Sequence, residues 1–150
     1  MKKSAFTLLE ILVVISVLII LIGIIIPRFR GMQDAGRIAQ VKAELQTMQT
    51  AVEAYYTNKT PKAYPPSTVG VGAGFLASAT PQIINTTPPY DPWGPTATTE
   101  YNYVLSTNAK YYVISSVGVD GVYTTTVGVG SAGAVTKDAD DICVTNGSGC

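Results

Sequence analysis

Histidine is absent from this 150-residue chain, and with it the commonest general base and the commonest metal ligand of proteins. No Ser/His/Asp or Cys/His arrangement is possible, and no phosphate-binding glycine loop is visible, so we expect no catalysis. An excess of charge is also missing, because ten basic residues balance ten acidic ones. A nucleic-acid partner would call for a basic face, and this composition suggests none.

Cysteine is scarce, and its two occurrences lie at the end of the chain. Cys143 and Cys150 do not form a CxxC pair, which argues against zinc and thioredoxin-like sites. A lone pair in a polar tail favours a disulfide that closes a short loop outside the cytoplasm. Two free thiols are the alternative.

Charge is almost absent from residues 6–26, where Glu10 is the one ionisable side chain. A helix of about twenty residues is roughly 30 Å long, which matches the hydrocarbon thickness of a bilayer. A secretory signal peptide would carry small residues after its apolar core. Here Ser4 and Ala5 precede the core, so a cut beside them would remove the lysine-bearing leader and keep the helix.

Glu10 stands inside this apolar segment and needs an explanation. A charged, unpaired carboxylate within a membrane span costs several kcal/mol, roughly, so such residues are usually paired or functional. The alternative is that Glu10 lies near the interface and reaches water.

A second apolar pattern follows the first. Its members recur at a 3-4-3-4-3 spacing, which predicts one face of an amphipathic helix: Ile38, Val41, Leu45, Met48, Val52 and Tyr55. The whole helix is predicted to run from Phe6 to about Thr57. Pro27 cannot donate to the helical ladder, so we expect a kink or local melting there. A dimeric coiled coil is the rival explanation of the stripe.

The remainder of the chain is rich in glycine, proline, threonine and tyrosine. Residues 101–105 and 111–117 are predicted strands, joined by a turn at residues 106–108, and residues 122–127 form a weaker candidate. A few strands cannot bury a core unaided. We therefore predict an α+β fold, with a small antiparallel sheet laid against the helix.

The N-terminus resembles that of type IV pilins and type II secretion pseudopilins. The residues that carry the resemblance are Lys2-Lys3-Ser4-Ala5, Phe6-Thr7-Leu8-Leu9-Glu10-Ile11 and Pro27. In that family a prepilin peptidase cuts just before the phenylalanine and methylates its new amine. The resemblance implies a leader over residues 1–5, a transmembrane and polymerisation helix over 6–27, and a pilin-like domain over 28–150 with its amphipathic helix at 28–57.

The same resemblance implies a role for three residues in assembly. The cut falls between Ala5 and Phe6, although the family usually has glycine before the cut. Glu10 becomes the fifth mature residue and Pro27 the twenty-second, as in the family. The cationic amine of Phe6 would neutralise Glu10 of a neighbouring subunit, which removes the cost of the buried carboxylate only on assembly.

Five further elements are similar to the major pseudopilin of type II secretion: Ala63-Tyr64-Pro65, Asp91-Pro92-Trp93-Gly94, Tyr101-Asn102-Tyr103, Ser116-Val117-Gly118-Val119-Asp120-Gly121 and Asp140-Asp141-Ile142. Residues 122–137 lack the Gly-Gly-Glu-Gly loop of that family. The cysteine pair also departs from it and is similar to the disulfide-closed terminal loop of true type IV pilins.

The resemblance implies a calcium site in the C-terminal loop. Its candidate ligands are Asp120, Asp138, Asp140 and Asp141, which offer the hard oxygen atoms that Ca²⁺ prefers. The alternative is that these are solvated tail charges beside an Asp120-Gly121 turn.

Three functions follow. The first is the major pseudopilin of a type II secretion system; its partners would be copies of itself, prepilin peptidase, minor subunits and an inner-membrane platform. It would start as a single-span inner-membrane precursor and end in a periplasmic filament. The second is a surface type IV pilin for adhesion or motility. The third is a single-span membrane-anchored binding protein that never polymerises.

Overall fold

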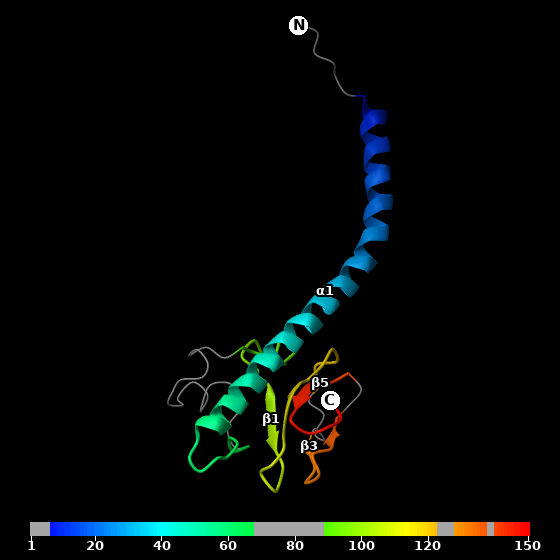
Figure 1. The fold of residues 1–150 in the computed structure, drawn as a ribbon. Helices are drawn as coiled ribbons and strands as arrows, with labels where there is room; N and C mark the ends of the chain where they lie inside the picture. The colour runs from blue at the N-terminus through cyan, green and yellow to red at the C-terminus, as the bar shows by residue number, and fades with distance from the viewer. Residues whose placement is uncertain (1–6, 68–88, 123–127, 138–139) are drawn as a thin grey trace. The chain divides into compact units, whose positions relative to one another are not determined.

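The computed structural model describes residues 7–67, 89–122, 128–137 and 140–150 (Figure 1). The chain divides into two compact units, Met1–Gly36 and Arg37–Cys150, and each is described by itself. In chain order, the described residues form the helix α1 and the strands β1 to β5.

Helix α1 spans Leu8–Asn58 and runs through both units. It begins after Thr7, whose side-chain oxygen accepts a hydrogen bond from the amide of Glu10 at 3.3 Å. It ends shortly before Pro61, within one residue of the predicted end. The helix is continuous past Pro27, so the predicted melting is absent from the isolated chain. An interruption at Pro27 stays a prediction for an assembled filament.

The main sheet has three antiparallel strands in the order β1-β2-β5. β1 (Asn102–Leu105) pairs with β2 (Tyr112–Ser116), and β2 pairs on its other side with β5 (Ile142–Thr145). The turn between β1 and β2 is closed by a 2.8 Å hydrogen bond from the Ser106 amide to the Tyr111 carbonyl. Two predicted strands and their hairpin turn are confirmed.

The end of the chain was expected to be a polar tail, but the structure shows a strand there. β5 is a strand of the main sheet, and its addition makes β2 the central strand. Two very short strands, β3 (Gly128–Val129) and β4 (Val135–Thr136), form a second antiparallel sheet. The strands β3, β4 and β5 were not predicted. A two-residue strand is too short to show a pattern of alternating residues, and β5 pairs with a strand that is distant in sequence. The predicted strand at 122–127 lies almost wholly outside the described residues.

The core lies between α1 and the main sheet, within the unit Arg37–Cys150 (Figure 1). Val41, Leu45 and Val52 are fully buried, and Met48 is 1 % exposed. Burying one such side chain stabilises the fold by about 1.5 to 3 kcal/mol. The predicted stripe is therefore covered by the chain's own sheet rather than by a second helix, and the α+β, pilin-like arrangement is confirmed.

Candidate functional site

The first half of α1 presents a continuous apolar surface. Every large apolar side chain in residues 8–26 is between 49 and 84 % exposed. By length and composition, α1 can cross a membrane. A soluble chain rarely exposes so large an apolar surface, so this segment requires lipid or other protein around it.

Glu10 lies in the first turn of α1. Its amide donates to the carbonyl of Thr7 at 3.1 Å and to the Thr7 hydroxyl at 3.3 Å. A Thr-x-x-Glu pattern is typical of a capping box, and a carboxylate in the first turn also complements the helix dipole. Glu10 thus stands at a helix start, where its charge is useful before any partner arrives. The pattern was present in the sequence and could have revealed this role.

The other predicted assembly residues are only partly within the described residues. Ala5 and Phe6 lie outside them, and Pro27 lies inside α1 with no description of its ring. Cleavage before Phe6, methylation of its amine and pairing of that amine with Glu10 therefore stay predictions.

In the second unit, one buried carboxylate joins two of the sequence motifs. Asp91 is 2 % exposed. Its oxygens accept hydrogen bonds from the Trp93 amide at 3.1 Å, the Ser116 hydroxyl at 3.0 Å and the Val117 amide at 2.9 Å. Hydrogen bonds to an ionised acceptor are roughly twice as strong as neutral ones. The Asp91 turn is thereby fastened to the end of β2.

Two glycines let these motifs approach other segments closely. A side chain at Gly94 would collide with Thr99 across the same turn. Gly118 has a φ of +73°, and a Cβ there would lie 2.6 Å from the carbonyl oxygen of Asp140. The Gly118 turn therefore lies directly against the segment that enters β5.

Two glutamates of α1 accept hydrogen bonds from Tyr112 of β2, from Tyr101 next to β1 and from Tyr64 in the segment after α1. Glu53 accepts a hydrogen bond from Tyr112 at 2.9 Å, and from Tyr64 at 3.3 Å to each of its oxygens. Glu44 accepts one from Tyr101 at 2.5 Å. Burial raises the pKa of Tyr101 and Tyr112, and the bonded carboxylates raise it further. These tyrosines therefore stay neutral donors at physiological pH and hold the sheet against the helix.

The Tyr64-Pro65 element also belongs to this interface. The Pro65 carbonyl accepts a 3.0 Å hydrogen bond from Tyr103. The Tyr64 ring stacks on Tyr56 with centroids 4.5 Å apart, and its hydroxyl accepts a 3.1 Å bond from Asn146 near the chain end. The elements noted in the sequence thus meet around one core.

Of the four candidate calcium ligands, the structure brings two together. The Asp120 amide donates to a carboxylate oxygen of Asp140 at 3.4 Å. Asp141 is 4 % exposed, and its main-chain oxygen accepts a 2.8 Å hydrogen bond from Lys137. Asp138 lies outside the described residues. Within the described part, no three acidic, cysteine or histidine side chains gather as a metal site would require. The calcium site stays a prediction.

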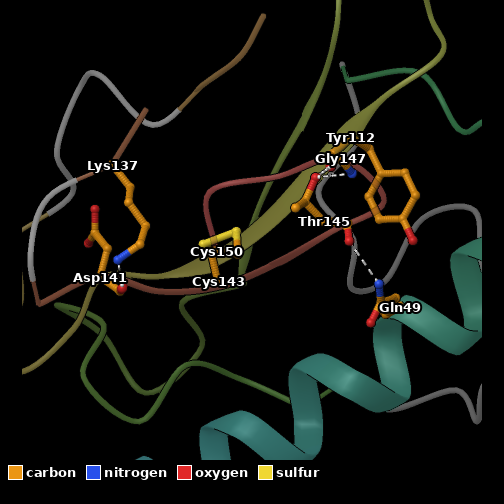
Figure 2. The surroundings of a disulfide bond; sticks show 8 residues. All are labelled: Gln49, Tyr112, Lys137, Asp141, Cys143, Thr145, Gly147 and Cys150. Carbon is orange, nitrogen blue, oxygen red and sulfur yellow. Dashed lines mark hydrogen bonds between the residues drawn. A yellow bond between two sulfur atoms is a disulfide. The ribbon is translucent and has the colours of Figure 1, made fainter. Parts of the chain in front are cut away.

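The predicted disulfide is present between Cys143 of β5 and Cys150 (Figure 2). The bridged loop is tied to the second sheet through Ser148. Its amide donates to the Gly133 carbonyl, and its carbonyl accepts from the Val135 amide, both at 2.9 Å. The loop therefore connects β5 of the main sheet to β4.

Comparisons with known proteins agree with this geometry. Residues 28–132 match the family described as Type II secretion system (T2SS), protein G. The chain is 27 % identical over 128 residues to the type II secretion system core protein G of Pseudomonas aeruginosa, covering 80 % of this chain and 86 % of that one. It is 30 % identical over 129 residues to that of Klebsiella pneumoniae, covering 81 % and 88 %. No solved structure matches significantly.

The matched region includes the buried stripe of α1, the Asp91 turn and the end of β2, which are the parts that form the core and the motif contacts. The resemblance to the major pseudopilin is thereby confirmed. This chain belongs to the type II secretion system protein G family.

Proposed function

We propose that this chain is the major pseudopilin of a type II secretion system, a structural subunit that polymerises through its N-terminal helix. One observation carries the proposal: none of the buried core residues that the structure describes comes from the apolar first half of α1. All members of the buried core cluster come from residues 41–114, while the apolar side chains of residues 8–26 are exposed. Family membership supports the same conclusion.

The proposed assembly starts from a precursor inserted in the inner membrane. Prepilin peptidase removes residues 1–5, which frees the Phe6 amine and deletes two lysines. The helix then leaves the lipid for a bundle of identical helices. Lipid tails are as apolar as the helix surface, so hydrophobicity favours neither environment strongly. A charged pair between the Phe6 amine and Glu10 of a neighbour would then favour assembly and set the axial register.

The other proposed partners are minor pseudopilins and the inner-membrane assembly platform, and the filament would occupy the periplasm. The proposal assigns no catalytic step to this chain. Exported proteins would be pushed or gated by the growing filament.

The experiment must separate the charge of Glu10 from its place in the helix cap. Glu10→Gln keeps a side chain of the same shape in the first turn and removes the charge. Thr7→Ala removes the capping hydroxyl seen at 3.3 Å and keeps the charge. Membrane fractionation reports insertion, and shear fractionation reports filaments. We expect all variants to insert, Thr7→Ala to assemble, and Glu10→Gln and Glu10→Leu to lose most filaments.

Normal filament yield from Glu10→Gln would contradict the charged pair. Loss of filaments from Thr7→Ala to the same extent as from Glu10→Gln would mean that the cap, and not the charge, is what assembly needs. Stable subunits that form no filament under any condition would favour the membrane-anchored binding protein.

A surface type IV pilin is the second candidate, and the Cys143–Cys150 bridge favours it. Deletion of the gene in its host separates the two functions. We expect secreted proteins to accumulate in the periplasm of the deletion strain, with surface pili unaffected. Loss of surface pili with normal secretion would favour the second candidate.

A further inference from the structure

Lys137 places a positive charge near two aspartates of the C-terminal part of the chain, Asp140 and Asp141. It directly follows β4, and its ammonium donates to the main-chain oxygen of Asp141 at 2.8 Å. Asp141 is 4 % exposed, and the Lys137 side chain is itself half-buried. Figure 2 shows the lysine chain extended beside Asp141, where the chain enters β5.

Protein contacts already join the segment at Gly118 and Asp120 to Asp140, which lies just before β5. The Asp120 amide donates to the Asp140 carboxylate, and Gly118 lies against the Asp140 carbonyl. Beyond them, the Cys143–Cys150 bridge anchors β5. These contacts join the same segments that a divalent cation would join.

The charged residues that line the cavity beside Lys137 are equal in number for the two signs. The charged residues that line this open cavity of about 430 Å³ are two lysines, Lys42 and Lys137, and two aspartates, Asp140 and Asp141. A divalent cation entering this space would meet the repulsion of two ammonium groups as well as the attraction of two carboxylates. Coulomb repulsion acts at the same range as the attraction, so it lowers the gain from binding the ion.

We propose that the Lys137 ammonium takes the place of a divalent cation in this chain, so that the C-terminal loop and β5 hold their places without calcium. The charge-assisted bond to Asp141 fastens the entry to β5. Its half-buried position protects it from screening by salt better than a bond at the surface. This inference leads to the opposite expectation from the calcium site predicted from sequence, and one experiment separates them.

The experiment is the thermal unfolding of the full oxidised chain in detergent micelles, followed by near-ultraviolet circular dichroism. Each protein is measured with a chelator and with about 1 mM Ca²⁺, a concentration at which extracellular calcium modules are occupied. The variants are Lys137→Met, Lys137→Arg and, as a matched control, Lys110→Met, whose side chain is exposed in the β1–β2 turn.

We expect the wild type, Lys137→Arg and Lys110→Met to have the same melting temperature with and without Ca²⁺. Lys137→Met should melt lower in chelator by roughly 2 to 4 °C, the shift expected for the loss of one net contact in a chain of this length. Ca²⁺ should restore part of that loss, because it would return positive charge to the cavity that Asp140 and Asp141 line.

Three results would overturn the proposal. A higher melting temperature of the wild type in Ca²⁺ would establish the predicted calcium site instead. Equal melting temperatures of Lys137→Met and Lys110→Met in chelator would show that the Lys137 ammonium does not stabilise the fold. If the melting temperature of Lys137→Met is lowered but does not change with Ca²⁺, Lys137 makes only a packing contact. If Lys137→Met fails to fold, the wild type and Lys137→Arg still test the proposal, because a melting temperature that rises with Ca²⁺ in either protein would contradict it. None of these outcomes depends on filament assembly, so they leave the proposed function to its own test.

Discussion

At the scale of single residues, Asp91 links two motifs that stand apart in the sequence. Its partner Ser116 lies 25 positions away, and the two are joined by a 3.0 Å hydrogen bond. The Asp-Pro-Trp-Gly turn was identified from sequence, but its carboxylate was not predicted to be buried. Only the packing of that turn against the end of β2 explains why an acidic residue is needed there.

Asp91→Ala should lower the free energy of unfolding by roughly 2 to 4 kcal/mol, because the amides of Trp93 and Val117 lose a charged acceptor, and each buried unsatisfied group costs about 1 to 3 kcal/mol. Urea denaturation of the full chain in micelles measures this. Asp34→Ala, on α1 outside the core, serves as the control and should stay within about 0.5 kcal/mol of the wild type. An Asp91→Ala midpoint equal to that of the control would mean that water replaces the carboxylate without loss.

At the scale of elements, α1 is one continuous helix whose two halves meet different surroundings. The half in the second unit is covered by the sheet through Val41, Leu45 and Val52, while the apolar side chains of residues 8–26 are exposed. The periodic stripe predicted the first behaviour and the unbroken apolar run predicted the second. Neither pattern required knowledge of the sheet, because both arise from the helix period itself.

The Cys143–Cys150 bridge gives an element-scale prediction. Replacing both cysteines with serine should lower the free energy of unfolding by roughly 2 to 3 kcal/mol, because the bridge limits the unfolded chain over a short loop. The separation of 7 residues keeps this effect modest. Chemical denaturation measures it, and the wild type treated with reductant is the control, which should match the double variant. Equal stability of the oxidised wild type and the double variant would assign the order of β5 to its pairing with β2 alone.

At the scale of the whole molecule, the proposed assembly requires that the precursor loses its leader before its first helix pairs with a neighbour. We expect the mature chain from its native host to begin with an N-methylated Phe6, because the leader holds Lys2 and Lys3 and blocks the amine that Glu10 would pair with. Intact mass spectrometry measures this directly. Protein made in a strain that lacks prepilin peptidase is the control and should keep the leader. A mature protein that retains Lys2 and Lys3 in the native host would contradict the proposed processing.

Local patterns were enough to predict much of this chain. The helix and its buried face follow from the period of apolar residues, and the β1–β2 hairpin follows from two adjacent strands separated by turn residues. Such features involve residues close in sequence, so their interactions can be anticipated from spacing alone. The disulfide could be anticipated for a similar reason, since Cys143 had one possible partner within the chain.

Other features depended on which distant segments pack together. β5 joins the sheet because β2 offers a free edge, and Glu53 binds Tyr112 because the sheet lies on that face of α1. Their residue types are common in exposed loops as well as in buried contacts, so composition could not distinguish the two. Burial decides the difference, and burial follows from packing between segments that the chain order keeps far apart.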